Sequence, residues 1–155
     1  MSAFKGLFEL QTPHDLLEKL RHDLERLRDS PIDQYAAFDF FVTAEHLIDW
    51  LLPGDGKRAA REAQRNSDSL LQVVSHIANG SKHFEATAKH HQSVQDTETT
   101  NGVFQAGTFQ SDAFDVPRLI IHLHGQAAAD LGSQIEVIAL AEKVLQFWEN
   151  HSQLK

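Results

Sequence analysis

Residues Pro31 to Leu52 read PIDQYAAFDFFVTAEHLIDWLL, and this stretch decides the fold class. Its aromatic and aliphatic side chains fall on nearly every side of a helix, and a helix that is apolar all round is usually buried. Pro53 and Gly54 follow it as a strong helix-breaking signal. The stretch therefore predicts a central helix over residues 31–52 that other helices cover.

An amphipathic helix is predicted on the N-terminal side, over residues 13–28. Its apolar stripe has the three- and four-residue spacing of a helix and consists of Leu16, Leu17, Leu20, Leu24 and Leu27. The strings TPHD from Thr12 and SPID from Ser30 repeat one helix-start signal. In this signal a hydroxyl residue is the N-cap, proline is the first helical residue and a carboxylate residue is the third helical residue. These signals place the two helix starts next to Pro13 and Pro31.

On the C-terminal side, a third helix is predicted from Lys57 or Arg58 to about residue 89, with its core stripe beginning at Leu70. Short strands are expected at 103–104 and 108–109, and a longer strand over 116–124. The capping box SQIE from Ser133 then opens the last helix. The fold predicted is one mainly α domain over residues 1–155, similar to a four-helix bundle. A small β-hairpin or sheet, at about 103–124, is inserted before the last helix.

Composition narrows the possible functions. The 155 residues carry a formal net charge of -8, which disfavours a broad phosphate-binding surface that ignores sequence. Cysteine is absent, so disulfides, thiolate metal sites and cysteine nucleophiles are excluded. The glycine-rich nucleotide loops, the GxSxG serine elbow and the HExxH zinc motif are missing as well. With no long apolar run, the chain is expected to be soluble and cytoplasmic, without a membrane partner.

Histidine stands out among the polar residues, with ten in the chain. His76, His83 and His90 recur every seven residues, which would align them on one face of the third helix, with Asn79 and Lys82 close by. The second helix has a half-polar face of its own, formed by Asp39, Thr43, His46, Asp49 and Trp50, next to Glu45. If these two helices pack antiparallel, the two faces meet around a solvent-reachable site.

Three interpretations of such a site remain open. In the structural one, histidines pair with carboxylates inside a bundle. In the second, His76 and His83 bind a metal with His46 and Asp49, although a seven-residue gap separates two ligands by about 10.5 Å along the axis. In the third, a histidine moves protons while lysine and asparagine hold a phosphate, as metal-independent RNA cleavage requires.

Two strings resemble a family of small bacterial helical proteins that carries no assigned activity: FFVTAEHLIDW from Phe40 and ANGSKHF from Ala78. More loosely, the string Asn-x-x-Lys-His late in a helix is similar to the HEPN group. HEPN domains are helical bundles, often dimeric, found in RNase toxins, phage-defence proteins and nucleotide-binding partners. The resemblance makes His83 the motif histidine and Asn79 a polar position before it. The motif arginine has no counterpart at the required spacing, since the nearest upstream arginine is Arg65.

The favoured interpretation is a HEPN-like cytoplasmic protein that acts on or binds RNA or a nucleotide, in a toxin or phage-defence system. His83 would be the acid–base group and Lys82 the phosphate contact, with Asn79 as a third catalytic residue. The other binding residues would be His76, His46 and Asp49. One alternative is a non-enzymatic binding or regulatory module or complex subunit with a partner protein, and another is a His/carboxylate metal-binding bundle. A homodimer is a further expectation, and no cofactor is assigned.

Overall fold

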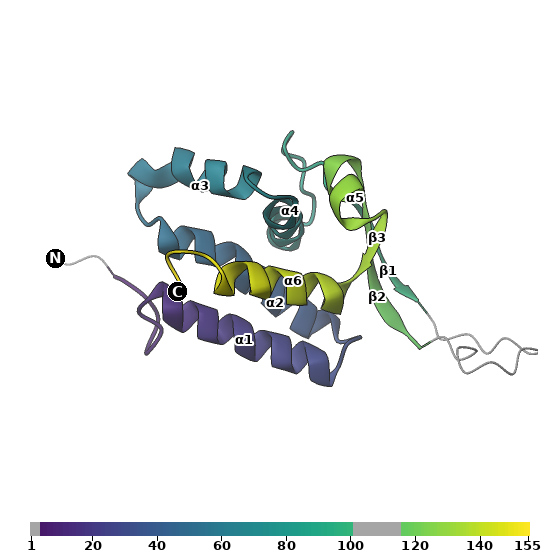
Figure 1. Ribbon diagram of the computed structural model, residues 1–155, viewed down its shortest axis with the longest axis horizontal. Helices are drawn as coiled ribbons and strands as arrows, with labels where there is room; N and C mark the ends of the chain where they lie inside the picture. The colour runs from purple at the N-terminus through teal and green to yellow at the C-terminus, as the bar shows by residue number, and fades with distance from the viewer. Residues whose placement is uncertain (1–3, 101–115) are drawn as a thin grey trace, which may run out of the picture.

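The computed structural model describes residues 4–100 and 116–155. Helices α1 (Pro13–Asp29), α2 (Gln34–Leu51) and α6 (Val137–Glu149) lie lengthwise in Figure 1, where α4 (Ser69–His83) is seen end-on. A three-stranded sheet covers one end of these helices. The prediction of a mainly helical fold with a small sheet before the last helix is therefore confirmed.

The core lies between α1, α2, α4 and α6, and the sheet contributes to it at one end. All five leucines of the predicted α1 stripe are buried in it, together with Trp148 of α6. The start of α1 also follows the sequence signal: the Thr12 hydroxyl accepts a hydrogen bond from the Asp15 amide at 3.2 Å, and the Asp15 carboxylate accepts one from the Thr12 amide at 2.8 Å. The leucine stripe and the N-terminal cap, both local features of the sequence, therefore determine where α1 forms and which face it buries.

Helix α2 differs from its prediction at two points. It begins after Asp33, whose carboxylate caps the amides of Tyr35 and Ala36, and not after Ser30. It is also not buried all round, because Phe38 is 48% exposed. Helix α2 therefore has more apolar side chains than it buries in the core, and part of one of its faces stays exposed.

The predicted helix over 57–89 is wrong, since this segment forms a short 3-10 turn (Asp55–Lys57) followed by two helices, α3 (Arg58–Asn66) and α4. The break falls at Ser67, whose hydroxyl donates to the Gln64 carbonyl, and Asp68, whose carboxylate caps Leu70 at 2.8 Å. No residue of α3 is buried, so it has no apolar stripe to continue into α4. Helix α4 ends at His83, and His90 lies beyond it.

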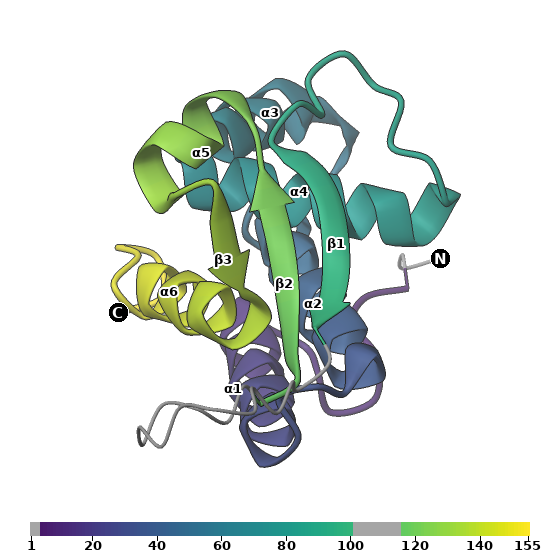
Figure 2. The same cartoon turned by 90° about the vertical axis from the view of Figure 1, so that its right-hand side faces the viewer.

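The sheet consists of β1 (Val94–Thr100), β2 (Arg118–Leu123) and β3 (Gln134–Glu136), all antiparallel in the order β1-β2-β3 (Figure 2). Helix α5 (Gly125–Leu131), which the sequence did not predict, connects β2 to β3. Strand β2 falls inside the predicted strand at 116–124. The strands expected at 103–104 and 108–109 lie outside the described residues.

Two further expectations about this region are wrong. The acidic run from Asp96 to Glu98 belongs to β1, so the sheet begins before residue 103, where the insertion was expected to start. The capping box from Ser133 does not open a helix, because Ile135 pairs with Ile121 in the sheet and α6 begins only at Val137. Pairing to a neighbouring strand overrides the local helix signal here.

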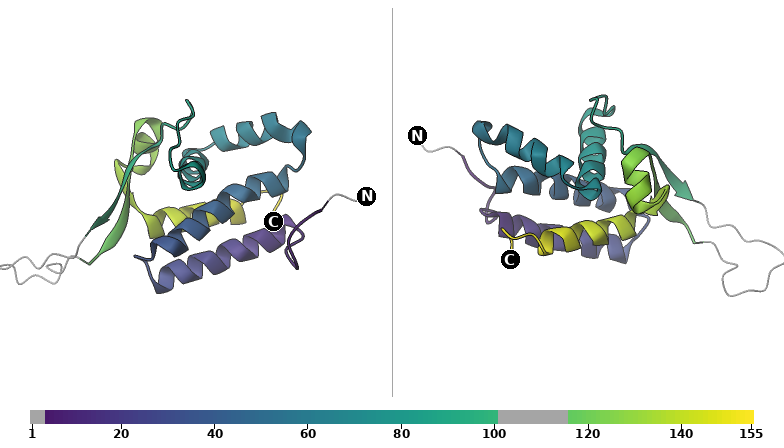
Figure 3. Two further views of the ribbon diagram at one scale, coloured as in Figure 1. Left: turned by 180° about the vertical axis from the view of Figure 1, so that it is seen from behind. Right: turned by 45° about the horizontal axis from the view of Figure 1, so that its top comes forward.

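Helix α2 separates α1 from α3 and α4, as the views of Figure 3 show. The part of α2 that stays open at Phe38 lies toward α3 and α4. Residues of all three helices converge there. Within the described ranges, no helix combines the length and the apolar character needed to cross a membrane.

Candidate functional site

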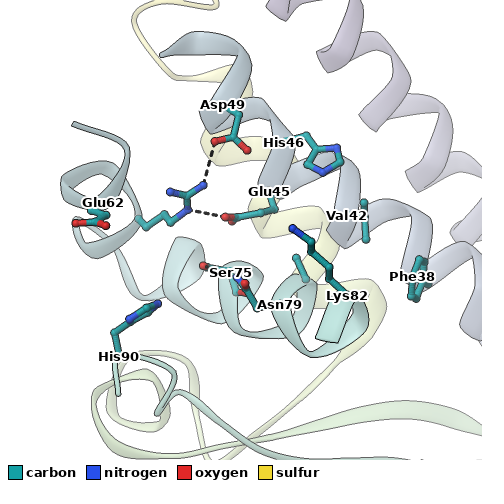
Figure 4. Close-up of a pocket in the computed structure, with 12 residues that line it drawn as sticks. Phe38, Val42, Glu45, His46, Asp49, Glu62, Ser75, Asn79, Lys82 and His90 are labelled. Carbon is teal, nitrogen blue, oxygen red and sulfur yellow. Dashed lines mark hydrogen bonds and ion pairs between the residues drawn. The ribbon is translucent and has the colours of Figure 1, made fainter. Parts of the chain in front are cut away.

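A groove of about 560 Å³ lies between α2, α3 and α4. Figure 4 shows the side chains around it. They are Phe38, Val42, Glu45, His46, Asp49, Glu62, Arg65, Ser75, Ala78, Asn79, Lys82 and His90. The volume falls in the range of about 300–1,000 Å³ that is usual for small-molecule sites.

Helix α2 supplies five of these residues through its periodicity. Phe38, Val42, Glu45, His46 and Asp49 are spaced three or four residues apart or adjacent, and so lie along one face of a helix. Phe38 and Val42 form an apolar end of the groove, while Glu45, His46 and Asp49 form a polar end. The side chain of His46 is exposed, so the groove is open to solvent.

Arg65 of α3 joins the two carboxylates of the polar end. Its Nε lies 2.5 Å from Glu45 Oε1, and its Nη2 lies 3.2 Å from Asp49 Oδ1. Arg61, also on α3, lies 3.3 Å from Asp49 through its Nε. The short helix α3 is thereby attached to α2 mainly by charge, which explains how it is held without a buried residue.

Glu45 is the most buried charged group of the groove, with a side chain only 10% exposed. Its Oε2 has no hydrogen-bond partner in the part of the chain that the structure describes. Burial raises the pKa of Glu45, although the guanidinium of Arg65 opposes this effect. An arginine stays protonated at any pH that proteins experience, so Arg65 is the group that makes burial of this carboxylate tolerable.

Helix α4 contributes an amide and an ammonium group. Asn79 Nδ2 donates to the Ser75 carbonyl at 2.8 Å, which fixes the amide and leaves its oxygen as an acceptor. Lys82, one turn further along α4, is exposed, and Figure 4 shows its side chain directed from α4 toward α2. Among residues 4–100 and 116–155, no carboxylate forms an ion pair with Lys82.

Four of the six residues singled out from the sequence therefore meet in one groove: His46, Asp49, Asn79 and Lys82. The row of three histidines is wrong, because α4 ends at His83 and the following Phe84 has a left-handed backbone, with φ of 65°. His83 is exposed and does not line the groove. Since successive helix residues are about 100° apart, Lys82 and His83 face different directions.

His76 lies outside the groove, in a cluster of three imidazoles. Its ring stacks on His91 at a centroid distance of 5.1 Å, and His91 contacts His90 at 4.2 Å. His76 Nδ1 accepts a hydrogen bond from the Val94 amide at 3.0 Å, so a neutral His76 carries its proton on Nε2. Neither ring nitrogen of His91 has a hydrogen-bond partner among the residues described. The cluster links the segment after α4 to the first strand.

Lowering the pH should reduce the stability of the folded protein through this histidine cluster. Burial lowers the pKa of His91 to about 4, with His90, His76 and Arg65 adding to the effect, and burial lowers the pKa of His76 in the same way. Between pH 6.5 and 4 the unfolded chain then binds more protons than the folded one, so stability falls as the pH falls through this window. We expect His91 to account for about 1 kcal/mol of this loss, because solvent screens a partly exposed ring.

Urea unfolding at pH 7.5 and pH 5.0 measures this effect. His91→Phe keeps an aromatic ring in the stack but cannot bind a proton, so it should lose less stability than the wild type between the two pH values. An equal loss in both proteins would show that His91 does not cause it.

Arg65 and Phe38 are among the groove residues that the sequence did not assign to the site. In the sequence, Arg65 lies too far upstream of His83 for the HEPN motif. Residues 57–89 were also predicted to form one straight helix, so Arg65 was not placed with the other site residues. The turn at Ser67 and Asp68, two residues that favour helix N-caps before an apolar run, was the available signal. Phe38 read as core because α2 is apolar throughout.

The metal interpretation gains no support from the geometry. In residues 4–100 and 116–155, no three His, Cys, Asp or Glu side chains are grouped so as to hold a metal ion. His76 and His46, two of the expected ligands, lie in different places: His46 lines the groove and His76 does not.

In comparisons with known proteins, no family model matches this chain, and no curated protein or solved structure is significantly similar to it. What the groove binds must therefore follow from its own chemistry.

Proposed function

We propose that the groove between α2, α3 and α4 binds the phosphate of a nucleotide or of RNA. Lys82 makes the charged contact to the phosphate. Asn79 and His46 orient the ligand, and Phe38 with Val42 forms the surface on which its apolar part rests.

The distribution of charge in the groove carries this proposal. Each of its three carboxylates already has an arginine partner: Glu45 pairs with Arg65, Asp49 with both Arg65 and Arg61, and Glu62 with Arg58. Lys82 has no such partner among the described residues. Its ammonium group is therefore available to an anionic ligand, even though the chain as a whole has a net charge of -8.

The apolar end of the groove suits the rest of a nucleotide. Phe38 is half exposed on a helix that otherwise buries its phenylalanines Phe40 and Phe41. Nucleobases stack on exposed aromatic side chains, and such stacking contributes about 1–3 kcal/mol per base. Phosphate and base would then contact opposite ends of the same groove.

Binding is better supported than cleavage. Acid–base cleavage of RNA needs an imidazole beside the bound phosphate, and His83, the residue expected in that role, does not line the groove. His46 and His90 do line it and are the imidazoles available for such chemistry. Any RNA cleavage measured with a chelator present should therefore depend on His46 or His90 and not on His83.

The proposal includes the setting that the HEPN resemblance implies. Nucleotides and RNA are cytoplasmic ligands, so we place the protein in the cytoplasm. A homodimer that acts in a toxin or phage-defence system is the corresponding biological role. The non-enzymatic alternative, a regulatory module or complex subunit, is compatible with the same groove when the bound nucleotide acts as a signal.

Lys82→Ala should weaken nucleotide binding by about tenfold or more, because hydrogen bonds to charged groups contribute about 1.5–3 kcal/mol. Isothermal titration with AMP and with a short RNA, in low salt, measures the effect. Lys143→Ala is the matched control, since Lys143 is also exposed but lies on α6, away from the groove. Equal affinities for the two variants would contradict the proposal, as would a wild-type protein that binds neither ligand.

A further inference from the structure

We infer that the groove selects a terminal phosphate or a diphosphate, as in a nucleoside diphosphate, over the internal phosphodiesters of RNA. Arg65 is the residue that makes this selection, and Asp49 is the carboxylate whose charge competes with the ligand for it. The inference rests on the proposed function, since it assumes that a phosphate binds at Lys82.

Arg65 has hydrogen-bond donors that no described residue uses. A guanidinium carries five N–H groups. Its Nε is used by Glu45 and its Nη2 by Asp49, while Nη1 donates to no residue in the described ranges. Because Arg65 lines the groove and is 21% exposed, a ligand can reach it. A second cation is thus present in the groove, partly occupied by carboxylates.

The two carboxylates that hold Arg65 differ in how readily they can leave. Glu45 is buried and has no other basic partner among the described residues, so it remains paired. Asp49 is 47% exposed and also pairs with Arg61, so it can leave Arg65 and keep a salt bridge. The exchangeable contact of Arg65 is therefore the one with Asp49.

A ligand that displaces Asp49 has to compete with a full carboxylate charge. A terminal phosphate carries about -1.5 to -2 charges near neutral pH, whereas an internal phosphodiester carries one. Terminal phosphates also offer three oxygens, enough for Lys82 and for a charge-assisted contact with Arg65 together. The competition with Asp49 therefore favours a terminal phosphate or diphosphate.

Charge around the groove acts in the same direction. A long RNA places a phosphate at each nucleotide and needs a track of cations for them. Here the cations close to the groove are already paired with carboxylates, apart from Lys82. A ligand whose negative charge is concentrated at one end therefore fits this distribution of cations better than a long RNA does.

The test compares three probes by isothermal titration: ADP, AMP and an RNA trinucleotide without terminal phosphates. The wild type should bind ADP at least tenfold more tightly than the trinucleotide. Asp49→Asn removes the competing charge and should tighten ADP binding about three- to tenfold, with a smaller gain for the trinucleotide. Lys82→Ala should weaken binding of all the probes.

Asp39→Asn is the matched control. Asp39 is on the same helix and is likewise about half exposed and paired with an arginine, Arg26, but it does not line the groove. It should leave ADP affinity unchanged. The inference is overturned if ADP and the trinucleotide bind equally well in a Lys82-dependent manner, or if Asp39→Asn matches Asp49→Asn. If no probe binds in a Lys82-dependent manner, the proposed function itself is wrong.

Discussion

Arg65→Met should destabilise the folded protein by about 3–5 kcal/mol at neutral pH, the usual cost of removing one partner of a buried ion pair. Glu45 would be left with a negative charge in a site where its side chain is 10% exposed. One of its oxygens already has no hydrogen-bond partner in the described part of the chain. The remaining option for Glu45 is to bind a proton, which its raised pKa favours.

Urea unfolding of Arg65→Met at pH 7.5 and pH 5.5 measures this loss. The loss should shrink at the lower pH, because protonation removes the unpaired charge. The double variant Glu45→Gln with Arg65→Met should recover much of the stability at neutral pH, since an amide carries no charge to bury. Arg58→Met is the control: Arg58 pairs with Glu62 at the exposed surface and should cost no more than about 0.5 kcal/mol. Equal losses for the two arginine variants would contradict the argument.

The fold could be predicted where local pattern and burial agree. The leucines of α1 and its capping box act within a few residues of one another, so the sequence alone determines them. The same holds for β2, where Ile120 and Ile121 are buried as a short apolar run. Prediction failed where a local signal competes with a distant contact, as at Ser133, whose capping box gives way to strand pairing by Ile135.

The site could be predicted only in the parts that lie on one helix. His46 and Asp49 share a face of α2, and Asn79 and Lys82 share a face of α4, because helical periodicity fixes both pairs. Arg65 reaches the same groove through the turn between α3 and α4, and no periodicity spans a turn. For this reason the sequence indicated a polar site without the arginine that holds its carboxylates.

Phe40→Ala should cost about 3–5 kcal/mol and lower the melting temperature by roughly 10 °C, because a large ring is removed from a fully buried position. Phe40 is 0% exposed and contacts Phe41 edge to face, with ring centroids 5.4 Å apart. Burying an aromatic ring contributes more than its area alone when it pairs with another ring. Thermal and urea unfolding monitored by circular dichroism measure the loss.

Phe38→Ala gives the opposite pattern on the same helix. Phe38 is 48% exposed and lines the groove, so its removal should cost less than about 1 kcal/mol of stability, as for most surface substitutions. It should instead weaken nucleotide binding, because the stacking surface is lost. A large loss of stability with unchanged binding would mean that Phe38 belongs to the core. The contrast between two phenylalanines two residues apart thus separates what α2 contributes to folding from what it contributes to the groove.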